Sequence, residues 1–383
     1  MLANLNFFLP LLAFSSLIFW LIPKTFPRLR AYWLIFVSLL LISIYAPIGG
    51  IYVGYLFLLG WLSSYLFARY KNFWALFLTL VLCLGPILHT RLIFDSKSIV
   101  VTLGIAFATV RTIGLIIDNY NKPGALKFTD TLLFISFFPL YTVGPVERPE
   151  AFVVDRLRNN FNFSDIVIGS TRIAKGIFIG RFIADGFLLS FTQSRFGLNG
   201  GNVDDLTVPE AWIYIAVRFL YSFLNFYAFC DVAIGASRLF GIKVLENFKA
   251  PLLAANIQDF WRRYHISMGN YITRYLFFPI VGFIRKSWAT YVASILAFIL
   301  FGLWHAFTLN YFLWGVFHGI ALSGYHFYRA HIKNKIVLNG IAMFFFRVIS
   351  TVVTVLFVAW VQAFANMKDI DTAVLLTKSM FGF

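Results

Sequence analysis

The sequence predicts an all-α protein that crosses a membrane many times. Of its 383 residues, 60% are hydrophobic, 20% are aromatic and only 13% are charged, and the mean hydropathy is +0.80. An ordinary soluble domain is about half apolar and about a quarter charged. A compact water-soluble protein could not bury this much apolar surface, and several uncharged runs are long enough to cross a bilayer. The composition therefore excludes a soluble globular enzyme.

Charge and cysteine content narrow the possible partners. The chain has 32 Lys and Arg against 16 Asp and Glu. Such an excess of positive charge is compatible with nucleic-acid binding. In a membrane protein, however, basic residues place loops on the cytoplasmic side, where they face anionic lipid. Membrane lipid is therefore an expected partner and nucleic acid is not. Cys83 and Cys230 stand singly in apolar runs, so we expect neither a disulfide nor a metal site.

Uncharged runs locate the membrane spans. Residues 1–23 carry no charge and no cleavage signal, which predicts a retained first span. The run 31–68 has 38 residues without Lys, Arg, Asp or Glu, nearly twice the roughly 20 that one crossing needs, so it should form a hairpin that turns at 46–50. The 42-residue run 287–328 repeats this pattern, with a turn expected at 308–310. Further spans are expected near 73–94, 98–117, 165–191, 210–230 and 341–365.

Loop charges set the expected orientation. The first loop carries Lys24, Arg28 and Arg30 and the second carries no charge, which places the N-terminus outside. If 131–146 is re-entrant, the segment 238–286, with eight basic and two acidic residues, falls inside. Pro and Gly residues in 131–146 favour that reading. We expect about ten crossings, both termini outside, a single domain over 1–383 and a multi-pass protein of the cell (inner or plasma) membrane.

Two histidines are the main candidates for chemistry. The segment 257–276 is predicted to form one amphipathic helix, with His265 on the side of Trp261 and away from the arginine face. His265 should therefore point toward the protein or membrane interior. His305 closes an uncharged span, where a buried imidazole would stay neutral and able to accept a proton. Either histidine could instead be a structural, hydrogen-bonded residue.

Other catalytic templates are missing from the sequence. It contains no H-E-x-x-H, no phosphate-binding P-loop and no G-x-S-x-G elbow. Charged residues do fall within or beside predicted spans, and interior salt pairs explain them better than a transport path. These residues are Arg111, Asp118, Arg172, Lys175, Arg181, Asp185 and Asp231.

An ordered set of motifs resembles the membrane-bound O-acyltransferase (MBOAT) family, in the bacterial branch that includes alginate O-acetylases and teichoic acid D-alanyl transferases. The resemblance runs from the N-terminal spans to about residue 328. A single Trp-His pair would be weak evidence, but an ordered set is specific. The segments that carry it are 115–120 (LIIDNY), 137–139 (FFP), 144–149 (GPVERP), 231–235 (DVAIG), 246–248 (ENF), 260–267 (FWRRYHIS), 302–305 (GLWH) and 314–319 (WGVFHG).

This resemblance implies an MBOAT-like fold with re-entrant and amphipathic helices, and transfer of an acyl group, acetyl in the first instance, from a thioester to a hydroxyl. The donor would be acetyl-CoA or an acyl carrier protein on the cytoplasmic side, with no permanently bound cofactor. The acceptor would be an extracytoplasmic polysaccharide or envelope polymer, reached directly or through an accessory acetyltransferase. His305 is implied as the catalytic base and His265 as a residue that positions the donor or polarises its carbonyl. The residues implied to bind substrate are Trp304, Trp261, Asp231 and Arg262.

Three alternatives stay open at this stage. D-alanyl transfer to teichoic acid would use the same chemistry with another acyl group. A transporter or flippase would explain the charges in the spans, although no inverted repeat is visible. A non-catalytic scaffold that recruits an extracytoplasmic partner would not need either histidine.

Overall fold

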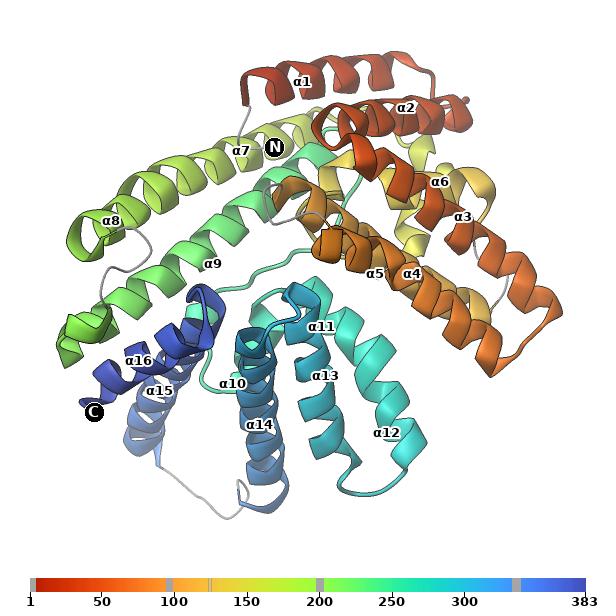
Figure 1. Cartoon of the computed structure of the whole chain (residues 1–383). Helices are drawn as coiled ribbons and strands as arrows, with labels where there is room; N and C mark the ends of the chain where they lie inside the picture. Colours follow the sequence, from red (N-terminus) through yellow and green to blue (C-terminus); the bar gives the residue numbers. More distant parts are fainter. Residues whose placement is uncertain (1–4, 94–98, 123, 125, 198–202, 333–338) are drawn as a thin grey trace. The chain divides into compact units, whose positions relative to one another are not determined.

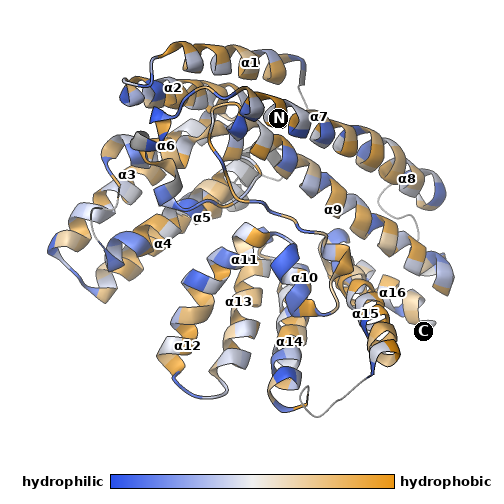
Figure 2. Cartoon of the chain, turned by 180° about the vertical axis from the view of Figure 1, so that it is seen from behind, coloured by the Kyte–Doolittle hydropathy of each residue, from blue (hydrophilic) through white to orange (hydrophobic). Residues whose placement is uncertain are grey.

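The computed structural model describes residues 5–93, 99–122, 124, 126–197, 203–332 and 339–383. In these ranges the chain is almost entirely helical and contains no β-strand, only one isolated bridge between Phe248 and Tyr264. Hydrophobic residues run along the long helices (Figure 2). The all-α class predicted from composition is therefore confirmed.

The chain forms two compact units. The first comprises residues 1–177 and 228–246, and the second comprises residues 178–227 and 247–383, so that α9 (Val208–Arg238) contributes to both. The helices of the first unit are α1 (Leu5–Leu21), α2 (Pro27–Tyr45), α3 (Pro47–Arg69), α4 (Phe73–Ile93), α5 (Ile99–Asn121), α6 (Phe128–Ser136) and α7 (Phe163–Phe178), labelled in Figure 1. The second unit contains the π-helical segment Ile179–Leu189, α8 (Ser190–Phe196), α10 (Ile257–Arg263), α11 (Ile266–Ile272), the π-helical turn Thr273–Phe277, α12 (Phe278–Ile284), α13 (Ala289–His305), α14 (Leu309–His331), α15 (Gly340–Asn366) and α16 (Ile370–Phe381).

Five of the described helices are long and apolar enough to cross a membrane. In α15, only 11% of the most apolar window is buried inside the protein, as expected for a helix that faces lipid. Two shorter apolar helices, 6–21 and 289–305, add to the set. The chain is thus a multi-pass membrane protein, while the expected total of ten crossings stays a prediction. The five long segments are Pro27–Tyr45, Pro47–Arg69, Phe73–Thr90, Val208–Arg238 and Gly340–Asn366.

Both predicted hairpins are present. The first turns at Ala46, between α2 and α3, where Pro47 starts the new helix because its fixed φ suits a first helical position. The second turns between α13 and α14 at 306–308, close to the expected turn. Thr308 accepts a hydrogen bond from the Tyr311 N–H and caps α14.

The segment expected to be re-entrant does not form a crossing helix. α6 ends after nine residues, and a 3-10 turn at Phe138–Leu140 follows it. The buried guanidinium of Arg111 donates to the Phe134 and Ile135 carbonyls at 2.9 and 3.2 Å. These carbonyls belong to the last turn of α6, where a cation satisfies backbone groups that have no helical partner. Among the described residues, Arg111 therefore stabilises the early helix end through these carbonyls, and not through the interior salt pair that was expected for it.

Ion pairs within the first unit extend α9 beyond its predicted end. Asp231 Oδ1 lies 3.4 Å from Arg172 and Asp231 Oδ2 lies 2.6 Å from Lys175. At the C-terminal end of α9, Arg238 lies 3.2 Å from Asp165. The expected span 210–230 stops where charges begin, but pairing with α7 lets the helix continue to Arg238. For Arg172, Lys175 and Asp231 the interpretation as salt pairs is confirmed, and the Asp231 carboxylate that they share is buried.

Glycines bring α13 and α14 into close contact. A Cβ on Gly302 would lie 2.1 Å from the Tyr311 carbonyl oxygen, and one on Gly315 would lie 2.4 Å from the Phe298 carbonyl oxygen. No larger residue fits at either place without separating the helices, which is the usual role of small residues between membrane helices. This close hairpin fixes the position of the C-terminal end of α13, where His305 lies.

Candidate active site

The predicted single helix over 257–276 is wrong. The chain is helical in α10, breaks at His265, and resumes in α11. His265 has φ and ψ of 50°, a left-handed conformation that a non-glycine residue seldom adopts. Strained backbone of this kind persists only where the surrounding structure enforces it.

The segment after α9 enforces this break. The N–H of Ile266 donates to the Asn247 carbonyl at 3.0 Å, and the N–H of Lys249 donates to the Arg263 carbonyl at 2.9 Å. These two bonds hold 247–249 antiparallel to 263–266 and draw the backbone out of helical geometry. Helical periodicity could not reveal them, because the paired segment 247–249 lies outside the predicted helix.

The side chain of His265 is buried, as its predicted direction required, with 4% exposure. Its Nδ1 lies 3.3 Å from Oδ1 of Asn247, and its ring meets the Phe226 ring edge-on at a centroid distance of 4.7 Å. Burial, together with the nearby positive charge that His305 carries when protonated, lowers the pKa of His265 from 6.5 to about 3. His265 is therefore neutral at physiological pH.

His305 is the last residue of α13 and is exposed, not buried as the sequence suggested. The helix ends at this residue. The ring stacks on Tyr311 at a centroid distance of 5.5 Å and lies 4.9 Å from the Phe301 ring. An exposed imidazole held between two aromatic rings is well placed for proton transfer to or from a bound hydroxyl.

Phe301 joins the two histidines. Its buried ring lies 6.2 Å from His265 and 4.9 Å from His305, measured between ring centroids. Trp261 and Trp304 contact the same ring at 5.9 and 6.0 Å. The second unit thus brings together four of the six site residues that were expected from the sequence.

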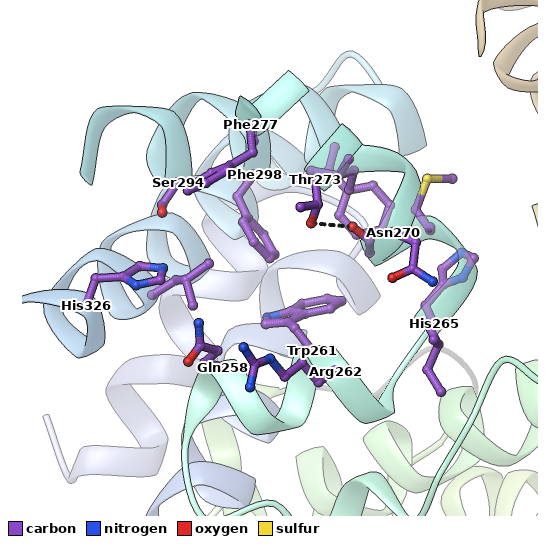
Figure 3. Close-up of a pocket in the computed structure, with 17 residues that line it drawn as sticks. Gln258, Trp261, Arg262, His265, Asn270, Thr273, Phe277, Ser294, Phe298 and His326 are labelled. Atoms are coloured by element: carbon purple, nitrogen blue, oxygen red, sulfur yellow. Dashed lines mark hydrogen bonds between the residues drawn. The ribbon is translucent and has the colours of Figure 1, made fainter. Parts of the chain in front are cut away.

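A pocket of about 360 Å³ opens beside this cluster, within the size range of small-molecule sites. In the view of Figure 3, His265 and His326 lie at opposite ends, with Trp261 and Arg262 between them. Phe298 and Phe301 contribute an apolar wall. The polar and charged residues that line it are Gln258, Arg262, His265, Asn270, Thr273, Ser294 and His326.

The two remaining expected site residues differ in their surroundings. Arg262 lines the pocket, is exposed, and makes no salt bridge within the described ranges, so its charge is available to an anionic ligand. Asp231 belongs to the first unit, where Arg172 and Lys175 already neutralise its carboxylate. Its expected role in substrate binding stays a prediction.

Three further residues contribute to this site without having been assigned a role from sequence. They are Asn247, Phe301 and the buried His318, whose ring lies 5.0 Å from Trp261 and 4.6 Å from Trp314. Among the described residues, Nδ1 of His318 has no hydrogen-bond partner. All three fall within or beside the motifs quoted above, but their contacts depend on tertiary packing that motifs do not specify.

The fold and this site define a class of protein. It is a helical membrane protein in which His265 lines a pocket and His305 lies against Phe301, another residue of the pocket wall. Residues 29–367 match the membrane-bound O-acyltransferase family, and the chain belongs to it.

Relatives of known assignment share part of the chain. A peptidoglycan O-acetyltransferase from Helicobacter pylori is 29% identical over 318 residues, covering 76% of this chain and 58% of that protein. A probable alginate O-acetylase, AlgI, from Pseudomonas putida is 31% identical over 233 residues, covering 60% and 47%. A teichoic acid D-alanyltransferase from Bacillus subtilis is 29% identical over 241 residues, covering 59% of each chain. The chain spans about half of the length of these relatives.

Proposed function

We propose that this protein is an O-acyltransferase of the cell membrane. It moves an acyl group, acetyl in the first instance, from a thioester to a hydroxyl of an extracytoplasmic polysaccharide or other envelope polymer. The observation that supports this most is the grouping of a buried neutral histidine and an open histidine on one phenylalanine ring, beside a pocket. Membership of the O-acyltransferase family and the names of the relatives agree with this chemistry.

His305 acts as the general base in this proposal. It takes the proton of the acceptor hydroxyl while the hydroxyl oxygen attacks the thioester carbonyl. The new C–O bond forms, the C–S bond breaks, and the departing thiolate recovers the proton from the imidazolium. Help of this kind typically accelerates a reaction by 10²–10⁴-fold.

The pocket suits the thioester donor. Acetyl-CoA and acyl carrier proteins both carry a phosphorylated pantetheine arm, and Arg262 at the pocket offers a cation for such an anion. The aromatic wall of Trp261, Phe298 and Phe301 suits the uncharged part of the arm and the acyl group. With the basic segment 238–286 predicted inside, donor and acceptor would approach from opposite faces of the membrane.

Reconstitution tests this function directly. The purified protein is placed in lipid vesicles with labelled acetyl-CoA and an envelope polysaccharide on the other side, and ester-linked label on the polymer is measured. Transfer should fall by roughly 10²-fold or more in His305→Gln, because Gln keeps hydrogen bonding but cannot accept a full proton near pH 7. Near-wild-type transfer by this variant at matched abundance would refute the assignment of the base.

D-alanyl is the one specific alternative to acetyl as the transferred acyl group. The likeness to a teichoic acid D-alanyltransferase keeps D-alanyl transfer as a second candidate. Mass analysis of envelope polymers from a deletion strain separates the two, since loss of acetyl esters supports the first and loss of alanyl esters supports the second. Loss of neither would favour a transporter or scaffold.

A further inference from the structure

The hydrogen bonds around Asn247 determine which of its side-chain atoms is the oxygen. One atom receives the backbone N–H of Ser267 at 3.1 Å and the Ser267 hydroxyl at 2.9 Å. A backbone N–H can only donate, so the atom that receives it is the carbonyl oxygen Oδ1 and not the amide nitrogen. This assignment depends on the backbone of the α11 N-terminus and not on the histidine.

The same oxygen faces Nδ1 of His265 at 3.3 Å. If the ring nitrogen were unprotonated, its lone pair would face a lone pair of the Asn247 oxygen. Both residues are buried, with 4% exposure for His265 and 1% for Asn247. Burial makes such an unpaired contact costly. The ring nitrogen must therefore carry the proton and donate it to Asn247.

We propose that Asn247 is a positioning residue that holds His265 in its Nδ1–H tautomer, so that Nε2 is unprotonated and is the atom offered to the substrate. His265 lines the pocket, and its Nδ1 is the ring nitrogen that faces Asn247. The inference deepens the proposed acyl transfer by assigning the working atom of the second histidine. It gives Asn247, which lies in the 246–248 motif, a role that the sequence did not assign.

This tautomer limits what His265 can do. A neutral imidazole with a proton on Nδ1 can accept a hydrogen bond at Nε2 from an N–H, O–H or S–H group, but it cannot donate one there. Because His265 is neutral at physiological pH, it does not polarise the thioester carbonyl as a hydrogen-bond donor. Of the two roles that the sequence suggested, positioning the donor agrees with this arrangement and carbonyl polarisation does not.

Nuclear magnetic resonance of ¹⁵N-histidine-labelled protein in lipid nanodiscs tests the tautomer without any substrate. The His265 signals are assigned by their loss in His265→Asn. We expect Nδ1 protonated and Nε2 unprotonated at pH 7 in the wild type. Asn247→Ala should release the tautomer, whereas Asn247→Asp should keep it and raise the titration midpoint of His265 by about 1–3 pH units through the added negative charge.

Ser267→Ala is the matched control, since it removes one donor to Oδ1 but leaves the backbone N–H and His265 in place; the tautomer should not change. A wild-type spectrum with Nε2 protonated would overturn the proposal. So would a midpoint for His265 that does not move in Asn247→Asp.

A transfer assay separates positioning from general support of the fold. If Asn247 acts through His265, Asn247→Ala should lower transfer in the wild-type background and have no further effect in His265→Ala. An equal loss in both backgrounds would show that Asn247 supports the fold in some other way. Absence of transfer in the wild type itself would refute the proposed function while leaving the spectroscopic result standing.

Discussion

Replacing Gly315 by alanine should disturb the candidate active site from a distance. Gly315 lies on α14 against α13, and its added Cβ would meet the Phe298 carbonyl oxygen at 2.4 Å and the Ile299 Cα at 2.8 Å. Both neighbours are backbone atoms of a regular helix, so no side chain can rotate away. The two helices must separate instead.

The size of this movement follows from the contact. Ordinary van der Waals contact begins at 3.4 Å, so the helices must separate by 3.4 − 2.4 = 1.0 Å at this point. Overpacking of a well-packed core costs about 1–3 kcal/mol. Because α13 ends at His305, the same shift displaces the proposed base, and a misplacement of about 1 Å can lower a reaction rate by roughly 10²-fold.

Thermal unfolding in detergent and acyl transfer in vesicles measure the two consequences. Gly324→Ala is the matched control, because it lies on the same helix with no atom within 4 Å of its Cβ. The control should be neutral or slightly stabilising, since Ala favours a helix by about 1 kcal/mol over Gly. If Gly315→Ala unfolds at the wild-type temperature and transfers normally, the reasoning from close helix packing is wrong.

Three other perturbations probe the site and the topology. His265→Asn should keep more activity and stability than His265→Ala, because Asn tolerates the left-handed backbone and its oxygen can still accept a hydrogen bond. If both variants lose transfer completely at normal protein abundance, His265 itself transfers a proton. Because the pKa of His265 is lowered to about 3 in the folded state, the stability it contributes is fully present above pH 6.5 and declines as the pH falls from 6.5 toward 3. As the pH is lowered across that range, the unfolding midpoint should therefore fall less steeply for His265→Asn than for the wild type. Identical pH dependence of the two midpoints would count against the lowered pKa of His265. A cysteine introduced near Arg285 should resist an impermeant reagent in intact cells, since 238–286 is predicted to be cytoplasmic; labelling there would reverse the predicted topology.

The sequence by itself determined the class of protein and the two hairpins of its long apolar runs. Long uncharged runs such as 31–68 and 287–328 can satisfy their backbone in a membrane only as helices, and their length required a turn in each. Turn residues such as Pro47 then marked where those turns lie. The motifs around His265 and His305 likewise carried the family assignment, because ordered polar residues between apolar spans are rare and specific.

Local patterns were less reliable where charged residues end a span. The predicted span 210–230 stops short because the sequence does not show that Asp231 and Arg238 are neutralised by residues of α7. The helix α16 was not expected, although Asp369 caps its start by accepting the Thr372 N–H at 2.9 Å. In both places the deciding contacts are hydrogen bonds and ion pairs that hydropathy does not register.

Only the tertiary structure decided the geometry of the site. Periodicity predicts a continuous helix through His265. Backbone pairing with Asn247 and Lys249 breaks that helix and leaves His265 in a left-handed backbone conformation. The end of α13 leaves His305 exposed, where the sequence alone predicted burial. The ring of Phe301, on α13, contacts both His265 and His305, although His265 lies 36 residues before Phe301 in the chain. Contacts between segments this far apart in the chain depend on three-dimensional packing, and no local pattern in the sequence encodes them.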